Sequence, residues 1–438
     1  MKSKKIKIAI IGGGFTGLTA AYELSKNKKF DVTVIEKNKY LGGLASSFDM
    51  NNVPLDKFYH HWFNNDKYAL ELVKELGIHN LLMPRNSNTG IYYANKKYRL
   101  STPYDLLTLK ALSFINRIRL GLVTIYVRKI VNWKKLESIT AFEWLQKICG
   151  KQVFNIIWKP LLIGKFGRFA PKISAVWIWN KLKLRGGSRD KGGNETLVYI
   201  KGGFKSLFDQ ISSKIIENNG KIVLNNKVIR LVSSGNGWNV ILKTKKLYFD
   251  SVLVTSHLPE FSEIISTFAS KKYLNSLAKI SYLGNMCLVL SLKKSLSSTY
   301  WLNINDPRFP FVGIIEHTNL EETNTYGTHI VYLSKYINIK EKLYAMDKDE
   351  FLDFSIKYIK KIFPEFSKDW IKSSYLWKED LTQPIVTKNY EEIIPDYKTP
   401  YKNLFLSTMA QIYPEDRGTN YAIREGKKIA EIIDTEYT

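Results

Sequence analysis

The chain has 438 residues, 45% of them hydrophobic, and a formal net charge of +26 at pH 7. This length and composition predict two or three domains with real cores and exclude an intrinsically disordered chain. Two cysteines far apart, Cys149 and Cys287, predict neither a disulfide framework nor a zinc site.

The charge excess suits anionic substrates or a membrane surface. No nucleic-acid-binding module is recognisable, so nucleic acid is not an expected partner. No stretch of about 18 uncharged apolar residues occurs, and a spanning helix is not expected. The first predicted strand begins at Ile6, which leaves no room for a signal peptide, so we expect a cytoplasmic protein.

The most specific pattern lies in the first 45 residues. The apolar run 6–11 predicts a buried parallel strand. Gly12, Gly14 and Gly17 follow as G-x-G-x-x-G, which allows a tight turn, close backbone approach to a pyrophosphate, and close helix packing. The helix expected over 16–26 directs its N-terminal amides at the phosphates.

A second strand, predicted over 31–35, ends in Glu36, nineteen residues after Gly17. An acid at about this distance accepts hydrogen bonds from a ribose in dinucleotide-binding folds. The first strand, the glycines, the helix, the second strand and the acidic residue therefore follow one another at the spacing that the motif requires. Together they predict a nucleotide-binding fold at the start of the chain.

Residues 41–45, Leu-Gly-Gly-Leu-Ala, resemble the second glycine motif of the flavin-dependent amine oxidase superfamily. That group includes monoamine oxidases, protoporphyrinogen oxidases, phytoene desaturases and, more distantly, UDP-galactopyranose mutases. Many members carry Arg where this chain has Leu44, which brings the motif closer to the desaturase-like branch. The resemblance implies that FAD is the cofactor. The cofactor-binding residues expected from this end of the chain are Gly12, Gly14, Phe15, Thr16, Gly17, Glu36, Lys37, Gly42, Gly43, Leu44 and Ala45.

His60 and His61 stand among aromatic residues in the segment 55–66. This segment resembles the part of UDP-galactopyranose mutases in which a histidine lies beside the isoalloxazine ring, so both histidines are catalytic candidates. Neighbouring residues of an extended chain point to opposite faces, so we expect only one of them to face the flavin. A structural histidine bonded to backbone is the alternative.

Residues 68–76 predict a short helix that is closed by Gly77. Residues 91–100 predict a hairpin with Asn95 near its turn, and this hairpin is expected to open a second, substrate-binding domain. A largely helical region follows from Thr102 to about residue 162. In it, Thr140 and Glu143 form a capping box, and Gly150 is the expected stop.

Residues 104–135 contain seven basic residues and one acidic residue, interspersed with residues that have long apolar side chains. In a continuous helix, Lys110, Arg117 and Arg128 would share one stripe. Such a segment can lie in a membrane interface, so we hypothesise peripheral contact with the inner face of the membrane. The alternative is a pair of domain helices with a solvated basic face.

The middle of the chain is expected to return to the cofactor domain and then to leave it again. Residues 199–207 resemble the Gly-Gly motif at this return, and Val228 matches the position whose backbone meets the adenine in relatives. The strands predicted in this part are 221–224, 227–232, 237–242, 246–249 and 251–255, and a helix is predicted over 206–218. Beyond residue 261, strands over 286–292, 311–316 and 329–336 predict an antiparallel sheet. A helix over 347–363 and a further strand over 375–378 follow.

The C-terminal stretch 403–426 resembles the last flavin motif of the superfamily. There a buried strand leads to a loop and a helix whose N-terminus points at the O2/N1 edge of the flavin. Gly418, Thr419 and Asn420 match this motif best. The usual acid after the strand is missing, so any acidic contact is expected from Glu415 or Asp416.

These observations predict an α/β protein: a Rossmann-like FAD-binding domain (1–90, 196–260, 399–438) interleaved with a mixed α+β substrate domain (91–195, 261–398). The expected function is an FAD-dependent oxidoreductase that takes a hydride from a C–H bond of a small or lipid-linked substrate. Two alternatives stay open: a non-redox flavoenzyme like UDP-galactopyranose mutase, and a flavoprotein with mainly a binding or assembly role. The oligomeric state is not predicted.

Overall fold

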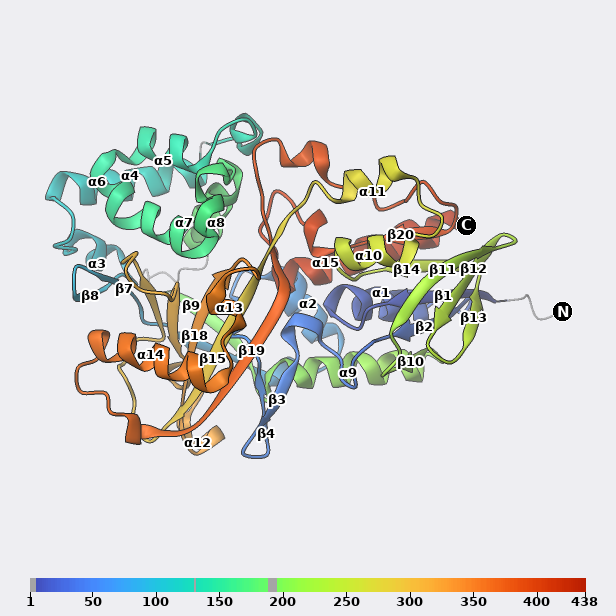
Figure 1. The fold of residues 1–438 in the computed structure, drawn as a ribbon, viewed down its shortest axis with the longest axis horizontal. Coiled ribbons are helices and arrows are strands. Elements are labelled where there is room, and N and C mark those ends of the chain that lie inside the picture. Colours follow the sequence, from blue (N-terminus) through green and yellow to red (C-terminus); the bar gives the residue numbers. More distant parts are fainter. Residues whose placement is uncertain (1–4, 130, 188–194) are drawn as a thin grey trace.

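The computed structural model describes residues 5–129, 131–187 and 195–438. At one end of the elongated molecule a parallel sheet is packed between helices and a small antiparallel sheet, and at the other end a larger sheet lies below a group of helices (Figure 1). The long strand β19 (Ile371–Pro384) runs between these two parts.

A five-stranded parallel sheet takes its strands from distant parts of the chain. Its order is β10 (Lys221–Val223), β2 (Phe30–Ile35), β1 (Ile6–Ile11), β14 (Ser251–Val254) and β20 (Leu404–Leu406). Every pairing in it is parallel. The predicted buried strands 6–11, 31–35 and 251–255 are thereby confirmed within one residue at each end, and they lie together although they are far apart in sequence.

Both faces of this sheet are covered. Ile8 and Ile10 pack against helices on one face, and Ala9 and Ile11 pack on the other, because side chains of a strand alternate. The helices of the first face are α1 (Phe15–Ser25), α2 (Lys67–Glu75), α9 (Gly203–Glu217) and α15 (Thr419–Glu436). The other face carries α10 (Leu258–Ile265) and the antiparallel sheet of β11 (Val228–Ser234), β12 (Gly237–Leu242) and β13 (Lys246–Phe249). The last two strands match the predicted hairpin residue for residue.

The larger sheet has seven strands and confirms the antiparallel sheet predicted beyond residue 261. Its order is β19, β15 (Tyr282–Leu292), β18 (His329–Ile337), β17 (Gly313–Glu316), β16 (Trp301–Ile304), β7 (Thr89–Tyr93) and β8 (Lys96–Arg99). Only the pairing of β16 with β7 is parallel among the pairings described for this sheet. The predicted hairpin 91–100 thus joins this sheet through β7. Helix α14 (Lys348–Ile362) covers one face, with Asp347 as its N-cap.

Several short elements were not predicted. They include the hairpin β3 (Ser47–Met50) and β4 (Val53–Asp56), the sheet of β5 (Trp62–Phe63), β9 (Thr196–Ile200) and β6 (Leu82–Asn86), and the short helices α11 (Lys271–Leu277), α12 (Thr323–Tyr326) and α13 (Lys342–Ala345). Strand β16 and helix α10 were not predicted either. The hairpin turns at Asn51 and Asn52, which both have positive φ, as a two-residue turn of this type requires.

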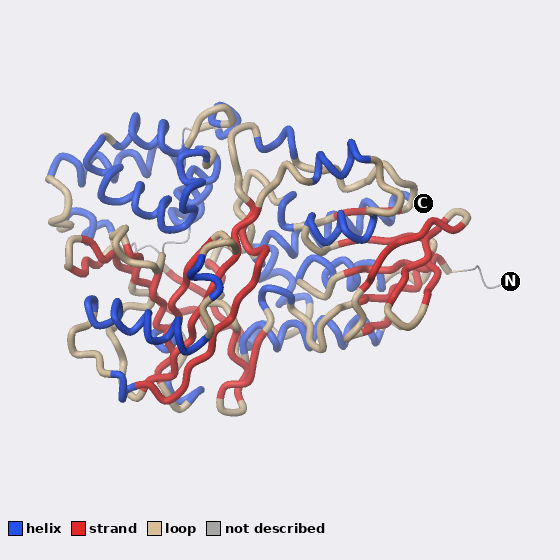
Figure 2. Tube along the Cα trace, viewed as in Figure 1, coloured by secondary structure: helices blue, strands red, loops and turns tan. Residues whose placement is uncertain are grey.

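A group of helices lies apart from most strands (Figure 2). It consists of α3 (Pro103–Leu107), α4 (Phe114–Lys129), α5 (Ala141–Cys149), α6 (Lys151–Val153), α7 (Lys159–Phe166) and α8 (Ala175–Gly187). The predicted capping box is confirmed: Thr140 Oγ1 accepts from the Glu143 amide at 3.2 Å, and Glu143 Oε2 accepts from the Thr140 amide at 2.8 Å. The helix it begins ends at Gly150, where φ is +79°.

Lys110, Arg117 and Arg128 do not share one stripe, because the segment is not the continuous helix that such a stripe requires. Helix α3 ends at Leu107 and α4 begins at Phe114, so Lys110 lies in the connection between two helices. The Arg117 side chain turns back onto that connection and donates to the carbonyl oxygens of Leu107 and Leu112.

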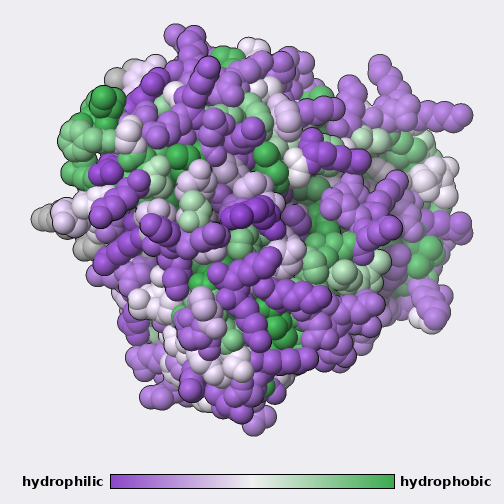
Figure 3. All heavy atoms as spheres, turned by 60° about the vertical axis from the view of Figure 1, so that its left-hand side comes forward, coloured by the Kyte–Doolittle hydropathy of each residue, from purple (hydrophilic) through white to green (hydrophobic). Residues whose placement is uncertain are grey.

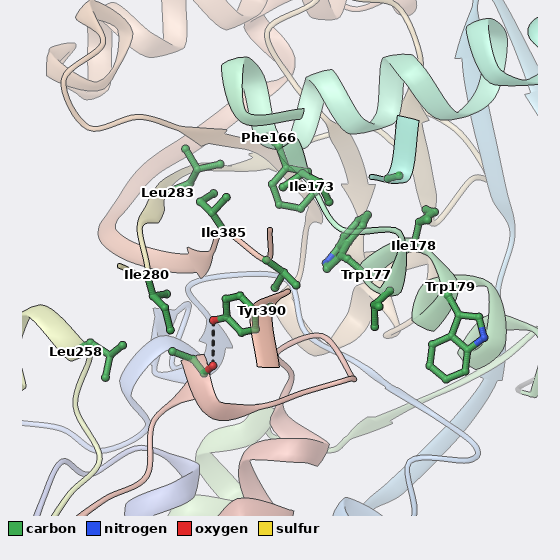
Figure 4. Close-up of a cluster of buried hydrophobic side chains, with 14 of the residues drawn as sticks. Phe166, Ile173, Trp177, Ile178, Trp179, Leu258, Ile280, Leu283, Ile385 and Tyr390 are labelled. Atoms are coloured by element: carbon green, nitrogen blue, oxygen red, sulfur yellow. Dashed lines mark hydrogen bonds between the residues drawn. The ribbon is translucent and has the colours of Figure 1, made fainter. Parts of the chain in front are cut away.

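An apolar core joins the helices to the C-terminal part of the chain (Figure 4). Phe166 and Trp177 pack there edge to face, with ring centroids 4.8 Å apart. Tyr390 is fully buried in the same cluster and donates from its hydroxyl to the Ala410 carbonyl at 3.0 Å. Cys149 and Cys287 are both buried and free. Among the described residues, no helix is long and apolar enough to cross a membrane.

Candidate cofactor site

A cavity of about 460 Å³ opens at the carboxyl ends of β1, β2, β14 and β20. In open parallel sheets, ligands bind outside these strand ends. The cavity is lined by residues that follow each of the four strands, by the turn 42–45, and by the start of α15. Of the fifteen residues predicted to bind the cofactor, all but Asn420 line it.

The first glycine turn is built as its motif requires. Gly12 has a φ of +115°, which favours glycine. A Cβ on Gly17 would lie 2.0 Å from the Gly12 carbonyl oxygen, so this glycine allows α1 to pack against the end of β1. A Cβ on Gly14 meets no described atom within 4 Å. The turn therefore leaves room for a ligand at Gly14.

Glu36 is buried at the end of β2 and is held in place by the first turn. Its Oε2 atom accepts from the Gly13 amide at 2.7 Å, and its Oε1 atom accepts from the backbone amide and the side-chain amide of Asn38, both at 2.8 Å. A carboxylate has about four acceptor positions, so Glu36 keeps capacity to accept from a ribose hydroxyl.

The second glycine motif touches the first. The Gly42 amide donates to the Gly13 carbonyl at 2.8 Å, and a Cβ on Gly43 would lie 3.5 Å from the Gly14 Cα. Gly42 and Gly43 both have positive φ, so this close approach depends on glycine at both positions.

Helix α15 begins at the cavity. Gly418 is its N-cap, no described side chain caps it, and its first turn carries no acidic residue. The unsatisfied amides of such a helix start carry partial positive charge. Thr419 lines the cavity and accepts from Trp62 Nε1 at 2.8 Å.

Asn420 departs from the prediction. Successive helix residues are turned by about 100°, so Asn420 points away from the cavity while Thr419 faces it. Its Oδ1 atom accepts from the Ala69 amide at 3.1 Å, in the first turn of α2. Asn420 therefore caps a neighbouring helix.

The two histidines are separated as the alternation of side chains suggests. His60 lines the cavity, and its ring lies 5.5 Å from that of Phe204. His61 does not line it: its Nδ1 atom lies 2.9 Å from the Tyr300 hydroxyl, and its ring packs against Phe63 and Trp301. Burial lowers the pKa of His60 to about 4, and the Arg417 charge acts in the same direction.

The C-terminal loop supplies a cation to the cavity where an acid was expected. Arg417 lines the cavity, but Glu415 and Asp416 do not. Glu415 pairs with Arg424 at 2.8 Å, and Asp416 pairs with Lys181 at 2.7 Å. The expected acidic contact from these two residues is therefore absent from the described lining.

Beyond β14, sequence reasoning offered His257 as a loose candidate but missed Thr255 and Glu260. Thr255 lines the cavity, and its hydroxyl donates to the Ile11 carbonyl at 3.0 Å. Beyond it, Glu260 joins His257 and Lys37 across the cavity edge, with the Lys37 Nζ atom 2.6 Å away. Although burial raises the pKa of Glu260, its bonds to His257 and Lys37 lower it to about 2. The only signal for this contact was the position of these residues after a buried strand.

The lining residues and the volume of the cavity fit FAD. Its volume lies in the range of roughly 300 to 1,000 Å³ that ligand sites have. Two adjoining glycine turns leave backbone exposed, Glu36 lies at the ribose position of the motif, and an uncapped helix start faces the same space.

Known proteins with similar sequences and structures point the same way. Coproporphyrinogen III oxidase of Staphylococcus aureus is 24% identical over 282 residues, 57% of this chain and 60% of that one. Protoporphyrinogen oxidase 2 of Arabidopsis thaliana is 23% identical over 333 residues, 66% of this chain and 65% of that one. The matches thus span less than two thirds of these relatives.

Among solved structures, reduced UDP-galactopyranose mutase superposes with a TM-score of 0.76 at 14% identity, covering 99% of this chain and 96% of that one. At this identity the likeness shows the fold alone. The model of the family described as flavin containing amine oxidoreductase matches residues 15–433, nearly the whole chain. This protein therefore belongs to the flavin containing amine oxidoreductase family, and FAD is its cofactor.

Proposed function

We propose that this protein is an oxidoreductase that takes a hydride from a C–H bond of a small or lipid-linked substrate. One observation carries the proposal: both glycine motifs and His60, from the first 60 residues, converge on a single cavity with the start of α15, near the other end of the sequence. Bound FAD supplies the redox chemistry, and the protein supplies binding, orientation and electrostatics.

The cavity residues have distinct proposed roles. The turn of Gly12, Gly14 and Gly17 holds the diphosphate with backbone amides, and Glu36 accepts from the ribose. Val228 lies at the adenine, and Gly418 and Thr419 lie at the flavin ring. The remaining cofactor contacts are assigned to Phe15, Thr16, Lys37, Gly42, Gly43, Leu44 and Ala45.

We propose that each of the two larger sheets forms the centre of one domain. We assign residues 1–90, 196–260 and 399–438 to a cofactor domain around the parallel sheet, and residues 91–195 and 261–398 to a substrate domain around the seven-stranded sheet. With these bounds the chain passes from one domain to the other after residues 90, 195, 260 and 398.

His60 is proposed to orient the reacting groups as a neutral imidazole. With a pKa of about 4, it is uncharged at pH 7, so it can donate one hydrogen bond and accept another but does not hold a proton in reserve. His61, packed against Tyr300, supports the wall behind it.

Consumption of an electron acceptor tests the proposed reaction. Turnover of an oxidisable substrate should consume acceptor in proportion to product. A mutase of the UDP-galactopyranose type would need flavin reduced beforehand and would consume no acceptor over many turnovers. A bound FAD that no donor reduces would indicate a binding or assembly role.

We also propose that α3 and α4 attach the protein to the inner face of a membrane. The exposed side of α4 is apolar: Phe114, Ile115 and Leu122 expose 63%, 77% and 62% of their surface. Ile118 and Ile125 continue this stripe at helical spacing, and Tyr104 and Leu107 of α3 extend it. We call these seven residues the apolar ridge. Figure 3 brings the helical side forward and shows hydrophobic side chains at a mostly hydrophilic surface.

The charges around the ridge favour an anionic lipid surface as its occupant. Lys110, Arg128 and Lys129 are exposed beside it, and the sequence from 106 to 136 contains no acidic residue. Each basic residue near an anionic membrane contributes about 1 kcal/mol to binding. A cytoplasmic protein held there has direct access to lipid or lipid-linked substrates.

A further inference from the structure

A cluster of charged side chains lies next to the cavity, where α7, α8, β18 and the loop before α15 meet. Asp416 is buried at its centre, with the Lys181 Nζ atom 2.7 Å and the Lys165 Nζ atom 3.6 Å from Asp416 Oδ2. Gln383 Nε2 donates to the other carboxylate oxygen at 3.1 Å. Arg417, the next residue, lines the cavity itself.

Arg417 is bonded to neutral groups. Its Nη2 atom donates to the Tyr336 hydroxyl at 2.6 Å, and its Nε atom donates to Gln383 Oε1 at 3.3 Å. Among the described residues, no carboxylate forms an ion pair with this guanidinium. A guanidinium has five N–H donors, so Arg417 keeps donor capacity at the cavity wall.

The positive charges of the cluster act on one another. Although burial alone would raise it, the charges of Lys181, Lys165 and Arg417 hold the pKa of Asp416 well below its usual range. Burial lowers the pKa of Lys181, and the charges of Lys165 and Arg417 act in the same direction against the attraction of Asp416. Asp416 pairs with Lys181 and Lys165, and Arg417 lies next to it, so among the described residues this cluster holds more positive than negative charge beside the cavity.

A buried positive surplus is costly unless an anion pairs with it. Arginine presents a planar fork that matches carboxylate and phosphate oxygens. Lys181 keeps 36% of its side chain exposed, whereas its ion-pair partner Asp416 is buried.

We propose that Arg417 and Lys181 form a subsite for an oxyanion, a carboxylate or phosphate group carried by the substrate. Arg417 lines the same cavity as His60, and Lys181 pairs with the neighbouring Asp416, so an anion held by Arg417 positions the rest of the molecule toward the cofactor. The inference rests on the proposed function only in assigning the anion to a substrate.

A titration of the FAD-loaded protein tests the subsite without turnover. Benzoate, phenyl phosphate and the neutral benzamide are added at constant ionic strength, and the visible absorbance of the bound flavin reports binding. We expect at least one anion to bind at least tenfold more tightly than benzamide; the stronger of the two identifies carboxylate or phosphate as the preferred group. Equal binding of benzamide, or no binding of either anion, would overturn the proposal.

Substitutions test whether Arg417 and Lys181 are the residues that bind the anion. Arg417→Gln and Lys181→Gln should each weaken anion binding at least tenfold, and Arg417→Lys should restore part of the loss. Lys183→Gln is the matched control, because Lys183 lies on the same helix but is exposed two residues away. Should Arg417→Gln fail to retain FAD, Lys181→Gln still decides. Unchanged anion binding in both Gln variants, with a shifted flavin potential in Arg417→Gln, would show that the cation serves the cofactor and would overturn the subsite.

Discussion

Gly17 faces the carbonyl oxygen of Gly12 so closely that a Cβ at position 17 would lie 2.0 Å from it. The contact fixes the distance between α1 and the end of β1. Gly17→Ala should therefore force the helix away from the sheet and lower the free energy of unfolding by about 1 to 3 kcal/mol. Denaturant unfolding of the protein stripped of FAD measures this loss.

Gly14 is the matched control, because it lies in the same turn but faces open space. Gly14→Val should leave the unfolding free energy of the stripped protein within about 0.5 kcal/mol of the parent. It should nevertheless abolish FAD binding, since the branched side chain enters the space at the turn. Stoichiometric FAD in purified Gly14→Val would contradict the assignment of this turn to the diphosphate.

Asn420 is expected to matter for stability rather than for FAD. Its side chain caps the first turn of α2, so Asn420→Ala should lower the unfolding free energy by about 1 kcal/mol. FAD stoichiometry should stay at that of the parent, whereas Thr419→Ala, at the cavity wall, should weaken FAD binding. Loss of FAD from Asn420→Ala without loss of stability would indicate that Asn420 binds the cofactor.

His60 should make the protein sensitive to acid. Its pKa is about 4 in the folded chain and near 6.5 in an unfolded one, so between these values the unfolded chain binds the extra proton. Stability from this group is complete above pH 6.5 and falls as the pH drops toward 4, by up to about 1.4 kcal/mol per pH unit. Urea unfolding of the stripped protein at several pH values should show a smaller decline for His60→Gln. Parallel declines would mean that His60 titrates normally.

Vesicle co-sedimentation tests the membrane proposal. Binding should require anionic lipid and fall with salt. It should weaken when Lys110, Arg128 and Lys129 become Gln, and also when Ile115 and Leu122 become Gln. Ile216→Gln is the matched control, since Ile216 is 60% exposed on α9, away from the ridge. Equal recovery in the supernatant with and without anionic vesicles at low salt would leave the ridge without a lipid partner.

The sequence allowed good predictions wherever a contact depends on neighbouring residues. The turn of Gly12, Gly14 and Gly17, the capping box of Thr140 and the hairpin of β12 and β13 are local, and each was placed within a residue or two. The Asn51–Asn52 turn carried an equally local signal, which was missed because the flanking strands are short and only partly apolar.

Other features depend on how distant segments meet. Thr255 reaches the cavity because β14 pairs in parallel with β1, and Arg417 reaches it because its loop packs against Tyr336 on β18. Thr419 and Asn420 point in different directions, and so do His60 and His61. Which residue of each pair faces the cavity depends on how its segment is rotated relative to the neighbouring elements. A motif locates such residues along the chain but does not settle which of two adjacent side chains faces the ligand.

The most direct test of the oxidoreductase proposal is anaerobic reduction of the bound flavin. The FAD-loaded protein is mixed without oxygen with an oxidisable candidate, first coproporphyrinogen III, on which a relative acts, and separately with UDP-galactopyranose after chemical reduction of the flavin. We predict that an oxidisable substrate bleaches the visible flavin absorbance and that an electron acceptor restores it. Conversion of the sugar nucleotide by the pre-reduced protein, with no bleaching of the oxidised protein by any donor, would contradict the account.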